Sequence, residues 1–132
     1  MCIDKPEGFL TDDEGELSKN AVIVLNDLLD YCDKLDKDVL FVVCPYEITQ
    51  VDKSKYNTIS EIIESRGYQF IDTNEYYEEM GIDYSKDFYN GDHPFGAKKF
   101  TEFLERYICE NYRMPDHRRD EKYNSWNEDP KL

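Results

Sequence analysis

The sequence predicts an α/β fold built on a parallel sheet with few strands. Residues 39–44 are apolar at every position and are followed by Pro45. An apolar run without alternation is typical of a strand that is buried on both faces. Amphipathic helical patterns flank this run on both sides, and a second short strand is expected over residues 68–72. Strand, helix and strand of these lengths predict a βαβ unit with a right-handed crossover.

The two helices of this unit follow from the spacing of their apolar residues. The first helix is expected over residues 18–34, with Ser18 as its N-cap. Its apolar face consists of Ala21, Val22, Leu25, Leu28, Leu29 and Cys32. The second helix is expected to begin at residue 52 or 54 and to end at Arg66, where Gly67 provides a left-handed stop. Its inward residues are Tyr56, Ile59, Ile62 and Ile63.

Beyond the second strand, the pattern predicts a short helix over residues 74–80 that ends at Gly81 and an aromatic loop over residues 82–94. The last helix is expected over residues 95–111. The chain therefore divides into an extended acidic lead-in (1–17), an α/β domain (18–112) and an irregular tail (113–132).

Two parallel strands make an incomplete sheet, because three or more strands are usually needed for independent stability. The apolar strand at residues 39–44 calls for a neighbour on each edge, and the sequence offers only one. We expect the missing strand to come from the irregular ends of the chain, from another chain such as a second copy, or from a missing N-terminal segment of a larger domain.

Composition excludes some classes of partner. The 132 residues carry a formal net charge of −14, which repels nucleic acids and anionic membrane surfaces. The four cysteines show no paired or metal-binding spacing, which favours free buried thiols in a reducing compartment. The sequence has no run long enough to span a bilayer. We therefore expect a cytoplasmic protein, or an extracellular or envelope protein if an upstream signal or anchor is missing.

The segment 87–101 carries the strongest candidate for chemistry. It holds His93, one of two histidines, among Gly91, Pro94 and Gly96, and it leads directly into the last helix. An imidazole in such a loop can be held still and remain open to a ligand. Asp92 is a candidate N-cap for that helix. The spacing of Asp87, Asp92 and His93 fits no EF-hand loop, and no metal site is predicted.

Several motifs together resemble the C-terminal part of the SGNH/GDSL hydrolase superfamily, in members of the kind found in Firmicutes. They are Val-Val-Cys-Pro-Tyr (42–46), Phe-Ile-Asp (70–72), Asp-Phe-Tyr-Asn-Gly-Asp-His (87–93), Gly-Ala-Lys-Lys-Phe-Thr (96–101), Pro-Asp-His-Arg-Arg-Asp (115–120) and Ser-Trp (125–126). The resemblance covers roughly residues 18–127, and it implies a three-layer flavodoxin-like fold with hydrolysis of a small-molecule or carbohydrate ester by a serine nucleophile, without a cofactor.

The resemblance also implies roles for individual residues. His93 takes the position of the catalytic base, with Asn90 in place of the usual aspartate three residues earlier and Asp92 beside it. Tyr46, Phe88 and Tyr89 take positions next to the substrate. An asparagine can orient an imidazole, but it cannot stabilise the imidazolium with a charge.

The superfamily's Gly-Asp-Ser block is absent from this sequence. A triad requires a nucleophile within reach of its base, so we expect the isolated chain to be inactive as an esterase. The alternative is a noncatalytic module derived from the same fold that binds carbohydrate or protein. Five aromatic residues remain open between a sugar-binding cleft and loop packing: Tyr76, Tyr77, Tyr84, Phe88 and Tyr89. Cys44 is interpreted as a core residue rather than as a partner of His93.

Overall fold

The fold was obtained as a computed structural model that describes residues 11–87 and 94–123, apart from the side chains of Ser85, Pro94, Phe95 and Tyr123. In chain order, the elements are α1 (Lys19–Lys34), β1 (Leu40–Val43), α2 (Gln50–Ser65), β2 (Gln69–Asp72), the 3-10 turn η2 (Thr73–Tyr76), α3 (Tyr77–Met80), α4 (Tyr84–Asp87), α5 (Pro94–Asn111) and the 3-10 turn η4 (Glu121–Tyr123).

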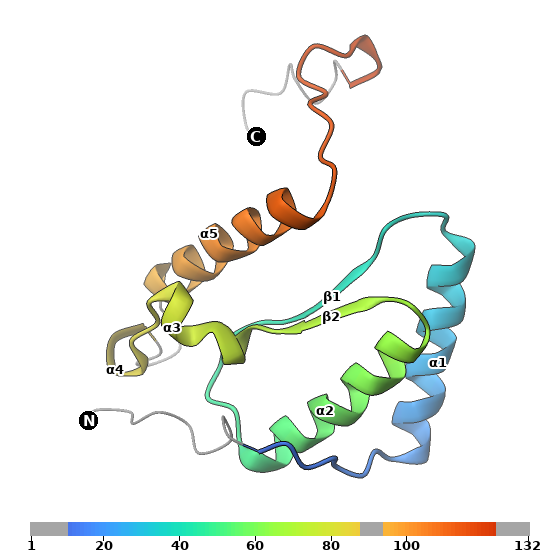
Figure 1. The fold of residues 1–132 in the computed structure, drawn as a ribbon, viewed down its shortest axis with the longest axis vertical. Helices are drawn as coiled ribbons and strands as arrows, with labels where there is room; N and C mark the ends of the chain where they lie inside the picture. Colours follow the sequence, from blue (N-terminus) through green and yellow to red (C-terminus); the bar gives the residue numbers. More distant parts are fainter. Residues whose placement is uncertain (1–10, 88–93, 124–132) are drawn as a thin grey trace.

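The two strands pair in parallel, with Phe41 opposite Phe70 and Val42 opposite Ile71. Figure 1 shows α2 on one side of the strands and α5 on the other, with α1 beside α2. The predicted α/β class and the predicted neighbouring parallel strands are therefore confirmed. Within the described residues the sheet has only these two strands, so the outer edge of β1 has no neighbour there.

Side chains and glycines set the ends of the helices. The Ser18 hydroxyl accepts a hydrogen bond from the Ala21 N–H (3.1 Å), as expected for the N-cap of α1. Helix α2 begins earlier than predicted because Thr49 forms a capping box with Asp52. Gly67 follows α2 with φ of 85°, a left-handed conformation that favours glycine. Gly81 plays the same part after α3, with φ of 67°.

The acidic lead-in is attached to α2. The Gly15 N–H donates to the carbonyl of Ser54 (2.7 Å), and the Thr58 hydroxyl donates to the carbonyl of Gly15 (2.7 Å). The Asn57 amide donates to the carbonyls of Thr11 (3.1 Å) and Asp13 (2.9 Å). A Cβ atom at Gly15 would lie 2.5 Å from the Ser54 hydroxyl oxygen, so only glycine permits this contact.

The core has two parts. The first part consists of the buried side chains of Leu29 and Cys32 from α1, Ile63 from α2 and Ile71 from β2. The second part is an aromatic cluster of Met80, Ile82, Tyr84 and Phe103, where α3, α4 and α5 meet. Tyr76, Tyr77, Phe100 and Tyr107 pack around it.

Two expectations are wrong. Residues 82–94 were predicted as a loop, but α4 forms there because the Asp87 carboxylate accepts from the Asp83 N–H (2.7 Å) and closes a helical turn. Cys32 is buried as expected, whereas Cys44 and Cys109 are exposed. Cys44 is exposed because it follows the last residue of β1 and lies outside the sheet.

Candidate functional site

Polar side chains gather where both strands end. The Asn74 side-chain oxygen accepts from the Tyr46 N–H (2.9 Å), and the Asn74 amide donates to Asp72 (2.8 Å). The Thr73 hydroxyl donates to the carbonyl of Val43 (2.5 Å). Thr73 and Asn74 are almost fully buried. In open α/β sheets, ligands bind beyond the carboxyl ends of the strands, but here these groups hold the two strand ends together.

A buried lysine reaches the same place from α2. The Lys53 ammonium donates to Asp72 (3.2 Å) and to Glu75, and both Lys53 and Asp72 are buried. Burial alone would lower the pKa of Lys53, but the carboxylates of Glu75 and Asp72 outweigh it and raise the pKa. Lys53 is therefore a fixed cation and not a base at neutral pH.

Tyr46, predicted to contact substrate, lies in this group. Its backbone is held by Asn74, and its hydroxyl lies 3.2 Å from the hydroxyl of Tyr56. Burial, and then the hydrogen bond with Tyr56, raise the pKa of Tyr46. A phenol that resists ionisation is a hydrogen-bond donor at neutral pH and not a nucleophile.

Asp87, the acid that precedes the histidine segment, is already engaged. Its carboxylate is buried and accepts from the Lys99 ammonium (2.8 Å), which also donates to the carbonyl of Gly81 (2.7 Å). Gly96 lies against the same residue, since a Cβ there would be 3.1 Å from the Asp87 carbonyl oxygen. These contacts, which we call the Asp87 clamp (Asp87, Gly96 and Lys99), fix the two elements on either side of residues 88–93.

The remaining predicted site residues, Phe88, Tyr89, Asn90, Asp92 and His93, lie outside the described residues. Their predicted roles as base, orienting groups and substrate contacts therefore stay predictions. Figure 1 shows that α4 and the start of α5, which bound this segment, lie at the end of the molecule where the strands terminate.

None of the serine side chains that the structure describes is placed as a nucleophile. Ser18 caps α1, and Ser54 and Ser65 donate to carbonyls of their own helix (2.8 and 2.7 Å). Ser60 donates to Glu64 one turn later (3.1 Å). In the same part of the chain, no group of three or more His, Cys, Asp or Glu side chains could hold a metal ion. No described helix is both long and apolar enough to cross a membrane.

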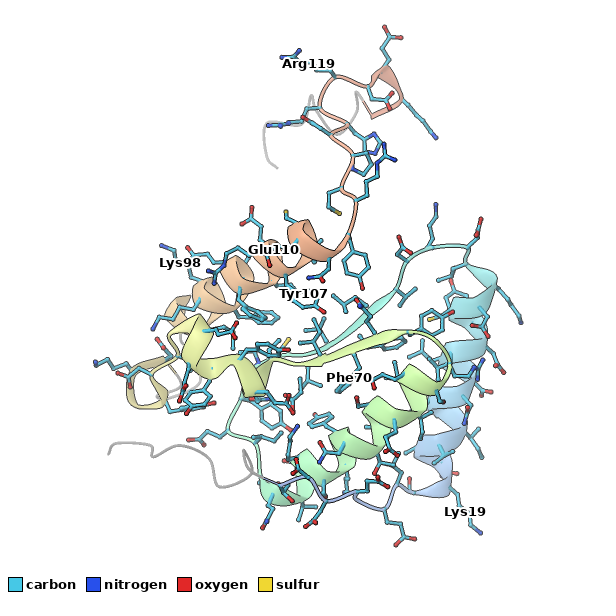
Figure 2. All side chains as sticks on the ribbon, viewed as in Figure 1. Lys19, Phe70, Lys98, Tyr107, Glu110 and Arg119 are labelled. Carbon is cyan, nitrogen blue, oxygen red and sulfur yellow. The ribbon has the colours of Figure 1, made fainter. Side chains whose placement is uncertain are left out.

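A cavity of about 350 Å³ lies between α3 and α5. It is lined by Tyr76, Glu79, Phe103, Arg106, Tyr107 and Glu110. Figure 2 shows Tyr107 on the side of α5 that faces the strands and Lys98 on the opposite side. Of the aromatic residues proposed for a sugar-binding cleft, Tyr76 lines this cavity, whereas Tyr84 is buried in the aromatic cluster.

Sequence reasoning missed Lys53, Thr73 and Asn74. Thr73 and Asn74 directly follow the Phe-Ile-Asp strand end, and this position was a usable signal because polar residues after a parallel strand gather at one edge. Lys53 gave no such signal, since a lysine in the first turn of a helix is normally exposed. Comparison of the chain with protein-family models, with curated proteins and with solved structures finds no match.

Proposed function

We propose that this chain is a noncatalytic assembly module whose incomplete sheet takes up a strand from another polypeptide. The observation that carries the proposal is the outer edge of β1. Leu40, Phe41, Val42 and Val43 are all apolar and only half-buried, and β2 is the one strand paired with them among the described residues. By composition β1 is a central strand, whereas β2 begins and ends with the polar residues Gln69 and Asp72.

Strand addition follows from the chemistry of such an edge. Backbone N–H and C=O groups at an open edge are available to an extended segment, and side-chain contacts then select the partner. The polar groups at the strand ends support the same function. Asn74 accepts from the Tyr46 N–H and Thr73 donates to the Val43 carbonyl, so the end of β1 is fixed to the residues that follow β2. A fixed edge loses little conformational freedom on binding.

A tethered strand tests this proposal. A second copy of residues 39–44, with serine in place of Cys44, is joined to the N-terminus by a flexible Gly/Ser linker of roughly 20 residues, which spans about 25 Å. We expect the melting temperature to rise by about 5 °C, with slower hydrogen exchange at the β1 amides. The control carries prolines at two positions of the added strand. Equal melting of the two fusions, with unchanged exchange, contradicts strand addition.

An esterase related to the SGNH hydrolases is the second candidate, on a three-layer flavodoxin-like sheet. The observation that favours it is the Asp87 clamp, which fixes the elements bounding the segment of His93 at the strand ends. Hydrolysis of p-nitrophenyl acetate by the purified chain, compared with His93→Ala, tests this candidate. We expect equal background rates for both proteins. Turnover that His93→Ala abolishes and a serine reagent blocks would favour the hydrolase over the assembly module.

A further inference from the structure

Helix α1 leaves an unusual amount of apolar surface in solvent. Seven large apolar side chains are exposed in the described part of the chain, and five of these belong to α1 or to its C-cap residue. They are Ile23 (57% exposed), Val24 (65%), Leu28 (45%), Tyr31 (59%) and Leu35 (38%). Leu29 and Cys32 of the same helix are buried, so α1 has an apolar side toward the core and a second one away from it.

The second side has the spacing of a helix–helix seam. Val24, Leu28, Tyr31 and Leu35, which we call the α1 stripe, are separated by four, three and four residues. This alternation places side chains along one line on a helix and is the pattern of the a and d positions in coiled coils. Ile23 lies off that line.

Two opposite charges border the α1 stripe on its solvent side. Asp27 and Lys34 are exposed and occupy equivalent positions, seven residues apart. Neither takes part in any ion pair formed within the described residues, although Asp30 and Asp33 of the same helix both pair with Arg66, the C-cap residue of α2. Asp27 and Lys34 therefore remain available to a partner.

We propose that the α1 stripe binds a second copy of this chain, with the two α1 helices antiparallel about a twofold axis. Val24 then packs on the partner's Leu35, and Leu28 packs on the partner's Tyr31. The same register brings Asp27 against the partner's Lys34, and the twofold axis repeats this pair. In a parallel arrangement, each charge would instead face the partner position five residues later, which is Cys32 for Asp27 and Val39, beyond the helix, for Lys34; neither carries a charge. Charge complementarity therefore selects the antiparallel second copy.

This interface is small and joins two acidic molecules. One helix face buries less than a standard interface, so we expect a dissociation constant of about 10⁻⁵ to 10⁻⁴ M. The net charge of −14 on each copy opposes association. Moderate salt screens this long-range repulsion, so the dimer should strengthen between about 20 and 150 mM NaCl. This inference rests on the proposed function only in that both describe the chain as an assembly module. The dimer uses α1, whereas the proposed strand addition uses the edge of β1.

Sedimentation equilibrium of the full chain between about 10 µM and 1 mM, which brackets the expected constant, tests the proposal. We expect a monomer–dimer equilibrium in the wild type. Asp27→Lys and Lys34→Asp should each weaken the dimer about tenfold, because each creates two repulsive pairs. The double variant should restore the dissociation constant to within about threefold of the wild-type value, because the two opposite charges have only exchanged places. Recovery by the double variant is a result that a merely structural role would not produce.

Charged substitutions at two exposed apolar positions provide the second arm of the test. Leu28→Glu should abolish the dimer, whereas Val51→Glu, at a side chain on α2 that is 61% exposed, should leave it unchanged; circular dichroism checks that both fold. A wild type that stays monomeric overturns the proposal, as does a dimer that survives Leu28→Glu or a double variant no better than the single ones. A monomer in which Leu28→Glu lowers the melting temperature would place a segment of the same chain over the stripe and also overturn it. None of these outcomes decides the tethered-strand experiment, which tests the proposed function separately.

Discussion

Helices α1 and α5 have similar patterns in the sequence but different surroundings in the fold. In α5, Phe103 is buried against Met80 and Tyr84, and Tyr107 packs beside it. In α1, Leu29 is fully buried, but Val24 and Tyr31 are more than half exposed. An amphipathic pattern shows which residues of a helix need cover. It does not show whether the same chain supplies that cover.

Truncation of one apolar side chain on each helix should give the largest difference in the free energy of unfolding. Phe103→Ala removes a buried ring from the aromatic cluster, and we expect it to lower the free energy of unfolding by about 3–5 kcal/mol. Leu28→Ala removes a half-exposed side chain and should change it by no more than about 0.5 kcal/mol. Urea unfolding of dilute monomer measures both. A Leu28→Ala loss as large as that of Phe103→Ala would show that the stripe is covered within one chain.

A second comparison concerns the polar side chains at the ends of β1 and β2. Among them, Asp72 forms the most hydrogen bonds. Asp72→Asn should lower the free energy of unfolding by about 2–3 kcal/mol, because it leaves the buried Lys53 with Glu75 as its remaining anion. Glu75→Gln should cost less than about 1 kcal/mol, because that carboxylate is half-exposed. Chemical denaturation of the two variants checks this order. The reverse order would mean that Glu75, and not Asp72, neutralises Lys53.

The stability of the first turn of α1 is expected to depend on its N-cap more than on tertiary contacts. Ser18→Ala removes the acceptor for the Ala21 N–H and should cost about 1 kcal/mol. Ser18→Gly should cost only a few tenths, since glycine is tolerated at N-caps. Hydrogen exchange in the first turn of α1 locates the effect. Equal losses in both variants would assign the effect to a contact other than the cap.

The smallest effect concerns the pH behaviour of the junction between α1 and α2. Hydrogen bonds from the Tyr68 hydroxyl (2.7 Å) and from Arg66 lower the pKa of Asp33 below its usual 3.8. A lowered pKa contributes stability above the unfolded value, and this contribution is lost as the pH falls through the folded value. Tyr68→Phe should shift the Asp33 carboxyl titration, followed by NMR, upward toward 3.8. A titration that does not move would assign the shift to Arg66 alone.

The sequence predicts the elements well where local rules act alone. The apolar run of β1, the cap at Ser18 and the left-handed Gly67 all appear as expected, because each depends on a few neighbouring residues. The turn that forms α4 was missed because it depends on Asp87 bonding to the backbone of Asp83. The attachment of Gly15 to α2 was missed for a different reason, since it joins residues far apart in the chain.

The candidate site was harder to predict than the fold. Tyr46 was correctly placed beyond a strand end, but its partners Asn74 and Tyr56 come from other elements. Lys53 was missed because burial of a lysine depends on whether two carboxylates converge on it, and the spacing within α2 carries no trace of Asp72 or Glu75. The histidine that dominates the sequence motif lies outside the described residues, so its role stays a prediction.

The edge of β1 that has no neighbour among the described residues also bears on colloidal behaviour. An apolar strand with an unoccupied edge is a template for edge-to-edge aggregation, and many proteins protect such edges with a lysine or a proline. Leu40–Val43 contains neither. The net charge of −14 can oppose this aggregation only by long-range repulsion, which weakens as the Debye length falls from about 30 Å at 0.01 M salt to about 3 Å at 1 M. We therefore expect the solubility of this protein to fall as the salt concentration of the buffer rises.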